Sequence, residues 1–176
     1  MREKMIHHFT YFDDVILIKP FCLDDAGKHL RGEDDEIRKW LNEGQVSTLE
    51  SVRNWIQSWQ DDGTVFPFAI WIIEDKTLVG MVEARTHWQT IEGLEDGDAN
   101  ISYCLYPDYR GKGYVTRAIK LIQGFLTTKG IKRAVIRISP DNVNSLKVPP
   151  RCGFQKTGQV RTESGEVSII FVREIQ

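Results

Sequence analysis

Residues 101–122 read ISYCLYPDYRGKGYVTRAIKLI, which predicts a strand, then a basic turn bracketed by glycines, then a helix. The turn is Arg110-Gly111-Lys112-Gly113, and the helix opens directly out of it. Strands that alternate with helices around one sheet are typical of α/β proteins. The segment therefore points to an α/β fold with a glycine turn between a strand and a helix.

The basic turn has the features of an anion-binding site. The first N–H groups of a helix have no intrahelical acceptor, and the helix dipole places positive potential at the same point. Gly111 and Gly113 let the backbone approach an anion without a Cβ in the way, and Arg110 and Lys112 add positive charge. The turn therefore predicts a phosphate or pyrophosphate site, with a solvated surface turn as the alternative for an isolated motif. It matches neither Walker A nor the dinucleotide-binding glycine pattern, whose third glycine position is Thr116.

Length and composition are those of an ordinary globular protein. The chain has 176 residues, 41% of them hydrophobic and 27% charged, and is long enough to form a core. The net charge of −2 and the pI near 6.1 argue against a nucleic-acid-binding protein, which needs a basic excess. We therefore expect a single domain over residues 1–176 and no nucleic-acid partner.

The cysteines and the N-terminal residues bear on the compartment. Three widely spaced cysteines, Cys22, Cys104 and Cys152, form neither a disulfide framework nor a zinc-binding spacing. Residues 1–14 lack the apolar core of a signal peptide, and no apolar run reaches the length of a membrane span. We therefore expect a cytoplasmic protein, a monomer or a homodimer, with no membrane partner and no metal.

Apolar spacing and turn residues divide the chain into alternating strands and helices. Helices are expected from Asp24 to about Leu30, from Asp34 onward, after the capping-box sequence 47–50, and from the basic turn to about Gly130. Strands are expected at 15–19, 65–73, 77–86, 99–106 and 132–138, with two more on either side of Ser164-Gly165. This arrangement predicts an α/β fold with one mixed central sheet of about six to seven strands and flanking helices.

Taken together, the motifs resemble those of the GNAT superfamily of acetyl-CoA-dependent N-acetyltransferases. The family's pyrophosphate motif, Gln/Arg-x-x-Gly-x-Gly/Ala, falls on residues 108–113, with Asp108 in place of its first residue. The family's Asn-x-x-Ser and the Gly-Phe pair that follows it fall on Asn142, Ser145 and residues 153–154. Residues 16–30 are similar to the branch that acetylates ribosomal-protein N-termini, and the resemblance covers nearly the whole chain.

The resemblance implies acetyl-CoA as the co-substrate and indicates where it binds. The pantetheine arm would pair with the edge of a splayed central strand at about residues 103–105, as a short peptide completes a sheet edge. The pyrophosphate would bind backbone N–H groups at the start of the helix. Four further basic residues either add positive potential or form a solvated face: Lys120, Lys129, Lys132 and Arg133. The residues assigned to acetyl-CoA are Tyr103, Cys104, Leu105, Arg110, Gly111, Lys112, Gly113, Tyr114, Val115, Thr116 and Asn142.

Acetyl transfer to an amine needs a group that takes a proton from the ammonium form. Being neutral at pH 7 costs roughly 4.6 kcal/mol for a lysine-type amine but only about 1 to 1.4 kcal/mol for an α-amine, so an N-terminal acceptor manages with a weak base. Glu83, in the strand beside the central one, is the first candidate base, with an outward-facing strand residue as the alternative. His87 is the second candidate. In the related branch a Glu often precedes the apolar residues of the central strand, but that position is Asn100 here.

The leaving thiolate needs a proton donor. Many family members use a Tyr four residues before the Gly-Phe pair, but this position is Pro149 here. Ser145 is the replacement that we favour, because a hydroxyl within hydrogen-bond reach of the sulfur can donate to it. Its alternative role is to cap a short helix with Asn142, a helix that Pro149 and Pro150 must end or kink.

The residues that would bind the amine acceptor are the hardest to identify from the sequence. Acidic residues cluster at 33–36 and at Glu92, Glu95, Asp96 and Asp98, where they either attract a cationic amine or form solvated loops. We predict an N-acetyltransferase that moves an acetyl group from acetyl-CoA to a primary amine, with a protein N-terminus as a candidate acceptor. A small-molecule acetyltransferase acting on an aminoglycoside, polyamine or amino acid is the first alternative. A non-catalytic module that binds acyl-CoA is the second.

Overall fold

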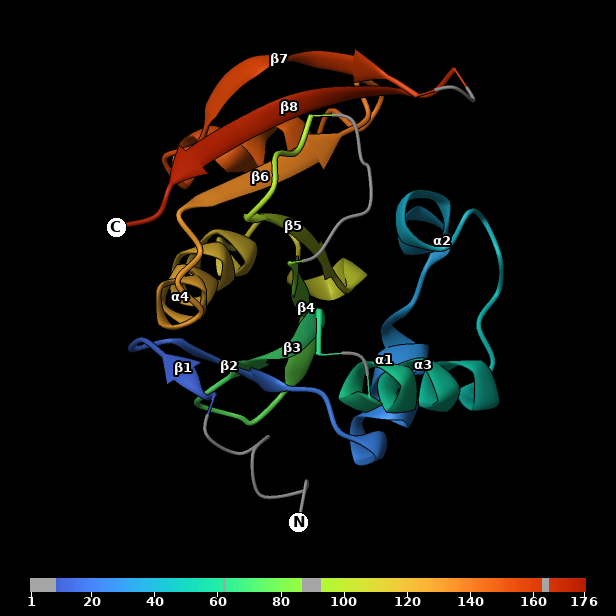
Figure 1. Cartoon of the computed structure of the whole chain (residues 1–176). Coiled ribbons are helices and arrows are strands. Elements are labelled where there is room, and N and C mark those ends of the chain that lie inside the picture. The colour runs from blue at the N-terminus through green and yellow to red at the C-terminus, as the bar shows by residue number, and fades with distance from the viewer. Residues whose placement is uncertain (1–8, 62, 87–92, 163–164) are drawn as a thin grey trace.

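The computed structural model describes residues 9–61, 63–86, 93–162 and 165–176 (Figure 1). Within these residues the centre is one eight-stranded sheet in the order β1-β2-β3-β4-β5-β6-β8-β7. The sheet is mixed, because β5 and β6 pair in parallel and the other neighbours pair antiparallel. The strands are β1 (Tyr11–Phe12), β2 (Ile16–Pro20), β3 (Val65–Ile72), β4 (Leu78–Arg85), β5 (Asp98–Leu105), β6 (Arg133–Ile138), β7 (Gln155–Arg161) and β8 (Val167–Glu174).

Helices cover both faces of the sheet. One face carries α4 (Tyr114–Thr128), and the other carries α1 (Ala26–Gly32) and α3 (Leu49–Asp61), with α2 (Asp35–Leu41) beside them (Figure 1). The short α5 (Val148–Arg151) packs on α4 and β7. In the part of the chain that the structure describes, no helix is both long and apolar enough to cross a membrane.

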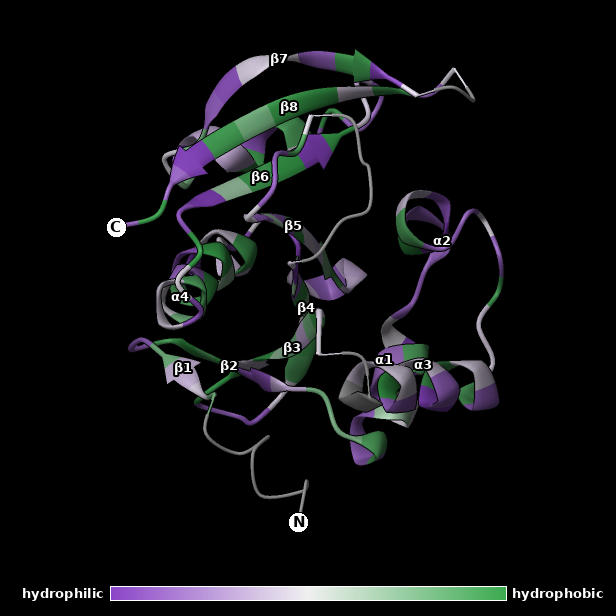
Figure 2. Ribbon diagram, in the orientation of Figure 1, coloured by the Kyte–Doolittle hydropathy of each residue, from purple (hydrophilic) through white to green (hydrophobic). Residues whose placement is uncertain are grey.

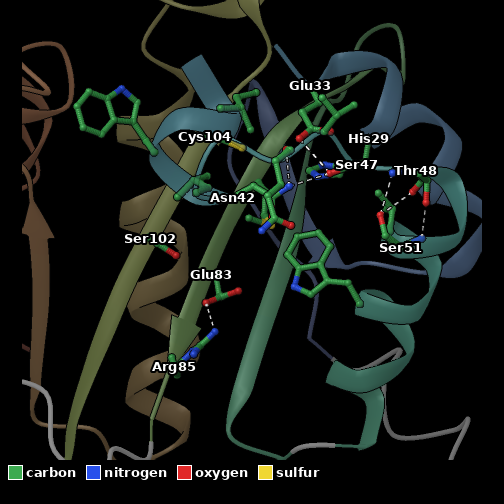
Figure 3. Close-up of a pocket in the computed structure, with 18 of the residues that line it drawn as sticks. His29, Glu33, Asn42, Ser47, Thr48, Ser51, Glu83, Arg85, Ser102 and Cys104 are labelled. Carbon is green, nitrogen blue, oxygen red and sulfur yellow. Dashed lines mark hydrogen bonds and ion pairs between the residues drawn. The ribbon is translucent and has the colours of Figure 1, made fainter. Parts of the chain in front are cut away.

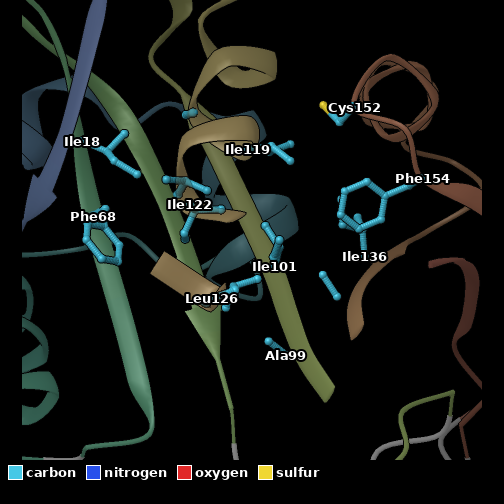
Figure 4. Close-up of a cluster of buried hydrophobic side chains, with 14 of the residues drawn as sticks. Ile18, Phe68, Ala99, Ile101, Ile119, Ile122, Leu126, Ile136, Cys152 and Phe154 are labelled. Atoms are coloured by element: carbon cyan, nitrogen blue, oxygen red, sulfur yellow. The ribbon is translucent and has the colours of Figure 1, made fainter. Parts of the chain in front are cut away.

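Alternation along the strands gives the two faces separate cores. Phe68 and Ile70 of β3 belong to the cluster beneath α4, whereas Ala69 and Trp71 belong to the cluster beneath α1 and α3. Figure 4 shows the first of these clusters, in which Ile122 of α4 lies among residues of the sheet. Figure 2 shows hydrophobic segments along β4, β6 and β8, while the longer helices mix hydrophobic and hydrophilic residues, as amphipathic helices do.

Strands β5 and β6 separate after their first residues. Their parallel pairing covers only residues 98–100 against 133–135. Beyond that point β5 stays paired with β4 as far as Leu105, and β6 stays paired with β8 as far as Ile138. Among the described strands, β5 therefore has an open edge after Asn100. This confirms the predicted splay of the central strand.

Most expected elements are present within a few residues, and the differences are informative. The added strand is β1, two residues that pair with β2 at the sheet edge, so the sheet has eight strands rather than six to seven. The first helical segment begins with a 3₁₀ turn, Leu23–Asp25, before α1. Pro149 and Pro150 do not end a helix but stand in the first turn of α5, where a proline needs no N–H partner. The turn residue Ser164 lies outside the described residues.

Candidate active site

The basic turn has the geometry that its glycines predicted. After the 3₁₀ turn Pro107–Tyr109, Gly111 adopts a φ of +75° and Gly113, the N-cap of α4, a φ of +84°. A side chain would be strained in this left-handed region. Apart from its chain neighbours, no described residue comes within 4 Å of the place where a Cβ would stand at either glycine. Open space in front of a 15-residue helix fits an anionic group such as pyrophosphate.

Arg110 does not present a free charge to that space. Its guanidinium donates to the two Asp34 oxygens at 2.8 and 2.9 Å and to Glu36 at 2.8 Å. Its Nε donates to the Leu105 carbonyl at 3.0 Å. The hydrogen bonds with Asp34 raise the pKa of Arg110 and lower the pKa of Asp34. Instead of adding its charge directly to the anion site, the arginine fastens α2 to the turn and balances two carboxylates that would repel a phosphate.

Two other basic side chains are also engaged away from the turn. Lys129, at the C-terminal end of α4, lies over three phenylalanine rings, the nearest at 4.7 Å. Arg133 binds Asp98 through bonds of 2.7 and 2.6 Å, and Glu95 at 2.8 Å. Asp98 is buried, so this ion pair is structural. The expectation of a solvated acidic loop is therefore wrong for Asp98, and Glu92 lies outside the described residues.

A cavity of about 480 Å³ lies between β5, the basic turn and α2. We call it the cofactor cavity, after its predicted ligand. The predicted cofactor and catalytic residues that line it are Tyr103, Cys104, Leu105, Arg110, Gly111, Gly113, Val115, Thr116, Asn142 and Ser145. The side chain of Lys112 instead lies over the Tyr109 ring, and Tyr114 packs against the core under α4. The structure thus brings ten of the predicted residues to one cavity and leaves Lys112 and Tyr114 out of it, and the contacts of all of them with acetyl-CoA stay a prediction.

A hydrogen bond spans the splay beside this cavity. Tyr103 Oη on β5 donates to the Ser145 carbonyl at 3.2 Å, and the Ser145 N–H donates to Asn142 Oδ1 at 3.2 Å. Burial raises the pKa of Tyr103, so its phenol stays protonated at neutral pH. Asn142 therefore caps this turn, and the Ser145 hydroxyl has no hydrogen-bond partner among the described residues. That hydroxyl is available to a bound molecule.

A second cavity of about 600 Å³ lies between the sheet and α1–α3, and we call it the acceptor cavity (Figure 3). Its floor is the face of β4 and β5 opposite α4. The paired floor residues are Met81 with Cys104, Glu83 with Ser102, and Arg85 with Asn100. The residues that line both cavities are Ile37, Trp40, Leu41 and Cys104. The two cavities therefore adjoin along α2 and the middle of β5.

Glu83 faces the acceptor cavity from β4. It is 7% exposed, and Arg85 Nη2 lies 3.5 Å from its Oε1 (Figure 3). Burial raises the pKa of Glu83, and the charge of Arg85 opposes part of that rise. A carboxylate of raised pKa is a stronger base than an exposed one, provided that it is ionised. The alternative of an outward-facing strand residue is wrong, while the catalytic role stays a prediction; His87 lies outside the described residues.

The opposite wall of the acceptor cavity is polar. His29 makes a 2.9 Å hydrogen bond through Nδ1 with Tyr106 Oη, and burial lowers the pKa of His29 to about 4. The imidazole is therefore neutral near pH 7. Glu33 accepts a hydrogen bond from Ser47 Oγ at 3.0 Å. Of the acidic cluster at 33–36, Asp35 has the solvated side chain that was expected, whereas Glu33 is buried.

Sequence reasoning missed residues that separate elements bring to the acceptor cavity. Trp40 comes from α2, Trp55 from α3 and Arg137 from β6. These residues stand in no motif, and helical apolar spacing alone would place the tryptophans in a core. One signal was usable: once Glu83 is assigned to the cavity face, antiparallel pairing places Ser102 on the same face.

Comparison with known proteins identifies the family. Residues 16–155 match the family described as acetyltransferase (GNAT) domain. The uncharacterized N-acetyltransferase p20 of Bacillus licheniformis is 27% identical over 157 residues, which cover 86% of this chain and 85% of that protein. The structure of RimL, a ribosomal L7/L12 alpha-N-protein acetyltransferase in complex with coenzyme A, has a TM-score of 0.79 at 17% identity, covering 95% of this chain and 98% of that one. The aminoglycoside acetyltransferase AAC(6′)-Ib in complex with coenzyme A has a TM-score of 0.75 at 18% identity, covering 90% and 94%.

The family match includes the elements that build both cavities. It spans β2, the splayed β5, the basic turn and the segment from Asn142 to Phe154. It confirms the predicted α/β fold and acetyl-CoA as the co-substrate, and it favours an enzyme over a non-catalytic binding module. The chain therefore belongs to the GNAT family of acetyltransferases.

Proposed function

We propose that the protein acetylates a primary amine by direct attack on the acetyl-CoA thioester in a ternary complex. The observation that carries this proposal is that the cofactor and acceptor cavities adjoin at Cys104 and α2, with Glu83 on the acceptor side. An amine in one cavity and a thioester in the other need no covalent enzyme intermediate. Burial raises the pKa of Cys104 to about 12, so its thiol is not a nucleophile near neutral pH.

Glu83 is the base of the proposed reaction. It takes a proton from the ammonium, and the freed nitrogen lone pair forms a bond to the thioester carbonyl carbon. The C–S bond then breaks, and the nitrogen releases its second proton to solvent to give the neutral amide. Removing the proton from an α-ammonium at pH 7 costs only about 1 to 1.4 kcal/mol, whereas removing it from a lysine ammonium costs roughly 4.6 kcal/mol. A single carboxylate therefore deprotonates an α-amine more easily than a lysine amine. The two reacting groups would meet near Cys104, which lines both cavities and lies two positions along β5 from Ser102, the strand partner of Glu83.

Ser145 is the proton donor to the departing thiolate. Its backbone is held by Tyr103 and Asn142, while its hydroxyl is without a hydrogen-bond partner among the described residues and lines the cofactor cavity. The hydroxyl donates its proton to the sulfur and regains one from solvent. A positioned hydroxyl serves this purpose best when its backbone is fixed by other groups.

The proposed acceptor is an α-amine such as a protein N-terminus. A groove of about 1330 Å³ continues from Ser102 and Arg137 toward Val167 and Ser168, and it offers a path for the rest of a peptide. RimL, whose fold this chain shares, is named for acetylation of such a terminus. The second candidate is a small-molecule amine, because the acceptor cavity of about 600 Å³ has the size of a small-molecule site.

The test is release of CoA thiol from acetyl-CoA with matched peptides. One peptide has a free α-amine and no lysine, and the other has an acetylated N-terminus and one lysine. We expect faster release with the first peptide. Glu83→Gln should lower kcat/KM by about 10²- to 10⁴-fold, the usual contribution of a positioned base. In the wild type the rate should fall, as pH is lowered, at a value above the ordinary glutamate range, because burial raises the pKa of Glu83.

Glu74→Gln is the matched control, because Glu74 is exposed in the turn between β3 and β4. It removes the same charge without touching either cavity, and its rate should equal the wild-type rate. An unchanged pH profile in Glu83→Gln would show that another group or water takes the proton. Preference for the lysine peptide would remove the N-terminal acceptor from the proposal.

A further inference from the structure

Glu33 is a buried carboxylate in the wall of the acceptor cavity (Figure 3). It follows Gly32, the last residue of α1, whose missing side chain lets the Tyr106 ring pack against the helix end. A Cβ at Gly32 would lie 2.3 Å from that ring. This close approach holds the end of α1 against the sheet. The side chain of the next residue, Glu33, is only 3% exposed.

Only one oxygen of Glu33 has a hydrogen-bond partner among the described residues. Oε1 accepts from Ser47 Oγ at 3.0 Å and lies 3.8 Å from Arg38 Nε. Oε2 is buried and has no hydrogen-bond partner in the same set. Leaving a buried carboxylate oxygen without a donor is unfavourable, so a donor that enters from the cavity would complete the site.

The floor of the cavity also offers hydrogen-bond-accepting atoms. Asn100 Oδ1 on β5 is buried and has no hydrogen-bond partner in the described part of the chain. The carboxylate of Glu83 faces the same space, and in Figure 3 it lies at the opposite end from Glu33. His29, which also lines the cavity, is neutral and adds no positive charge to it. A molecule that satisfies both carboxylates must therefore carry hydrogen-bond donors at two separate positions.

We propose that the substrate carries a second cationic amine, and that Glu33 binds it while Glu83 serves the amine that is acetylated. This inference rests on the proposed function, because it takes Glu83 as the reacting end. A primary ammonium supplies three donors, one of which can bind Oε2, the Glu33 oxygen that neither Ser47 nor the ion-paired Arg38 contacts in the described part of the chain. Of the two acceptors named under the proposed function, this selects the second, the small-molecule amine: the substrate class is a diamine or polyamine, and Glu33 is the residue that sets this specificity.

Two arginines that reach the cavity define the competing chemistry. Arg85 lies 3.5 Å from Glu83, and Arg137 extends from β6. An arginine can bind a substrate carboxylate, so a substrate with an amine at one end and a carboxylate at the other is the alternative to a diamine. The unpartnered oxygens belong to Glu33 and Asn100, which favour a cation. Experiment can separate the two chemistries directly.

The experiment compares three substrates of equal chain length: 1-aminohexane, 1,6-diaminohexane and 6-aminohexanoate. Thiol release from acetyl-CoA gives kcat/KM for each. We expect the diamine to exceed the monoamine by about tenfold or more, as one charge-assisted hydrogen bond provides. Glu33→Gln should lower kcat/KM for the diamine to the value for the monoamine, through a rise in KM. The rate with 1-aminohexane and the affinity for acetyl-CoA should stay at wild-type values.

Two variants separate binding from a structural role of Glu33. Ser47→Ala removes the hydrogen bond to Oε1 but keeps the charge, so the preference for the diamine should persist. Asp35→Asn removes a neighbouring charge whose side chain is fully exposed, and it should also keep the preference. Loss of the preference in either control would show that Glu33 acts through folding or long-range charge and would overturn the proposal.

Substrate preferences decide the remaining outcomes. Equal kcat/KM for monoamine and diamine in the wild type would overturn the inference and leave the proposed function standing. A preference for 6-aminohexanoate would also overturn the inference, and it would indicate that an arginine binds a carboxylate of the substrate. No thiol release with any amine would contradict the proposed function itself, together with the inference that rests on it.

Discussion

The cofactor side and the acceptor side of this protein are built in different ways. The cofactor side depends on backbone: the open edge of β5, two glycines with positive φ, and the N-terminus of α4. The acceptor side depends on side chains that α1, α2, α3, β4 and β5 bring together. A backbone site is encoded in a continuous segment, whereas a side-chain site depends on tertiary packing. This difference explains why the first could be located in the sequence, whereas of the second only Glu83 and the acidic cluster at 33–36 were candidates.

Replacing Ser145 by alanine tests whether the cofactor side needs a side chain at all. We expect kcat and kcat/KM to fall together by about 10²- to 10⁴-fold, because the hydroxyl acts only in the transition state. Affinity for acetyl-CoA should be nearly unchanged. The Asn142 side chain, and not the serine hydroxyl, caps the turn, so the melting temperature should also stay close to wild type.

The rate and the melting temperature together separate the two roles of Ser145. Loss of a helix cap costs about 1 kcal/mol of stability and spares the rate of the folded fraction. A lower melting temperature with a wild-type rate would therefore assign Ser145 to capping, and solvent or a bound water would have to protonate the sulfur. The cofactor side would then be a backbone site throughout.

Gly111→Asp and Gly113→Asp test the backbone part of the comparison. Acetyl-CoA at 100 times its dissociation constant should stabilise the wild type by about 2.7 kcal/mol. Each substitution places a strained side chain and a negative charge in the open space before α4, so the stabilisation should disappear. The measurement is the shift in melting temperature with acetyl-CoA.

Gly130→Asp is the matched control for strain and charge. Gly130 follows α4 at its C-terminal end, has a φ of +71°, and has open space where a Cβ would stand. The substitution should lower the melting temperature of the free protein and leave the acetyl-CoA shift intact. If all three variants lost the shift, the glycines would matter only for folding, and the pyrophosphate site would have to lie elsewhere.

Local patterns located the strands, the α4 helix and the turn, because each depends on neighbouring residues. The splay was also predicted, through the family resemblance, and strand pairing confirms it after Asn100. The sequence identified Glu83 as a candidate base. Strand alternation alone could not tell whether its side chain is buried, because it does not show which faces of the sheet the helices cover. Two covered faces make both sets of strand residues buried, as with Phe68 and Ala69.

Charged residues were the hardest to place from the sequence. Asp98 and Arg133 are 35 positions apart and form a buried ion pair, while Arg110 reaches Asp34 across 76 positions. No local pattern distinguishes such partners from solvated charges, because the pairing is decided when β5, β6 and α2 come together. Glu33 was named in the acidic cluster at 33–36, but its burial was missed for the same reason: it lies beside the contact between Gly32 and Tyr106, which are far apart in the chain.

Arg110→Ala tests whether the two sides act independently, and it should have the smallest effect. It leaves Asp34 and Glu36 uncompensated next to the cofactor cavity, so the Kd for acetyl-CoA should rise about tenfold through charge repulsion, about 1.4 kcal/mol. Because α2 lines both cavities, the KM for the amine should rise as well. Binding titrations and steady-state kinetics measure the two quantities separately.

Removing the carboxylates should reverse the defect in acetyl-CoA binding. Arg110→Ala combined with Asp34→Asn and Glu36→Gln restores charge balance, and asparagine at position 34 keeps the N-cap of α2, which accepts from the Ile37 N–H. Arg117→Ala is the control, since it removes an arginine of α4 whose partners are Asp13 and Asp14. If the triple variant recovers acetyl-CoA affinity but not the amine KM, Arg110 has two separable roles, neutralising charge on the cofactor side and holding α2 on the acceptor side. Recovery of both would mean that charge alone links the two sides, whereas an amine KM unaffected in every variant would show that α2 keeps its place without Arg110.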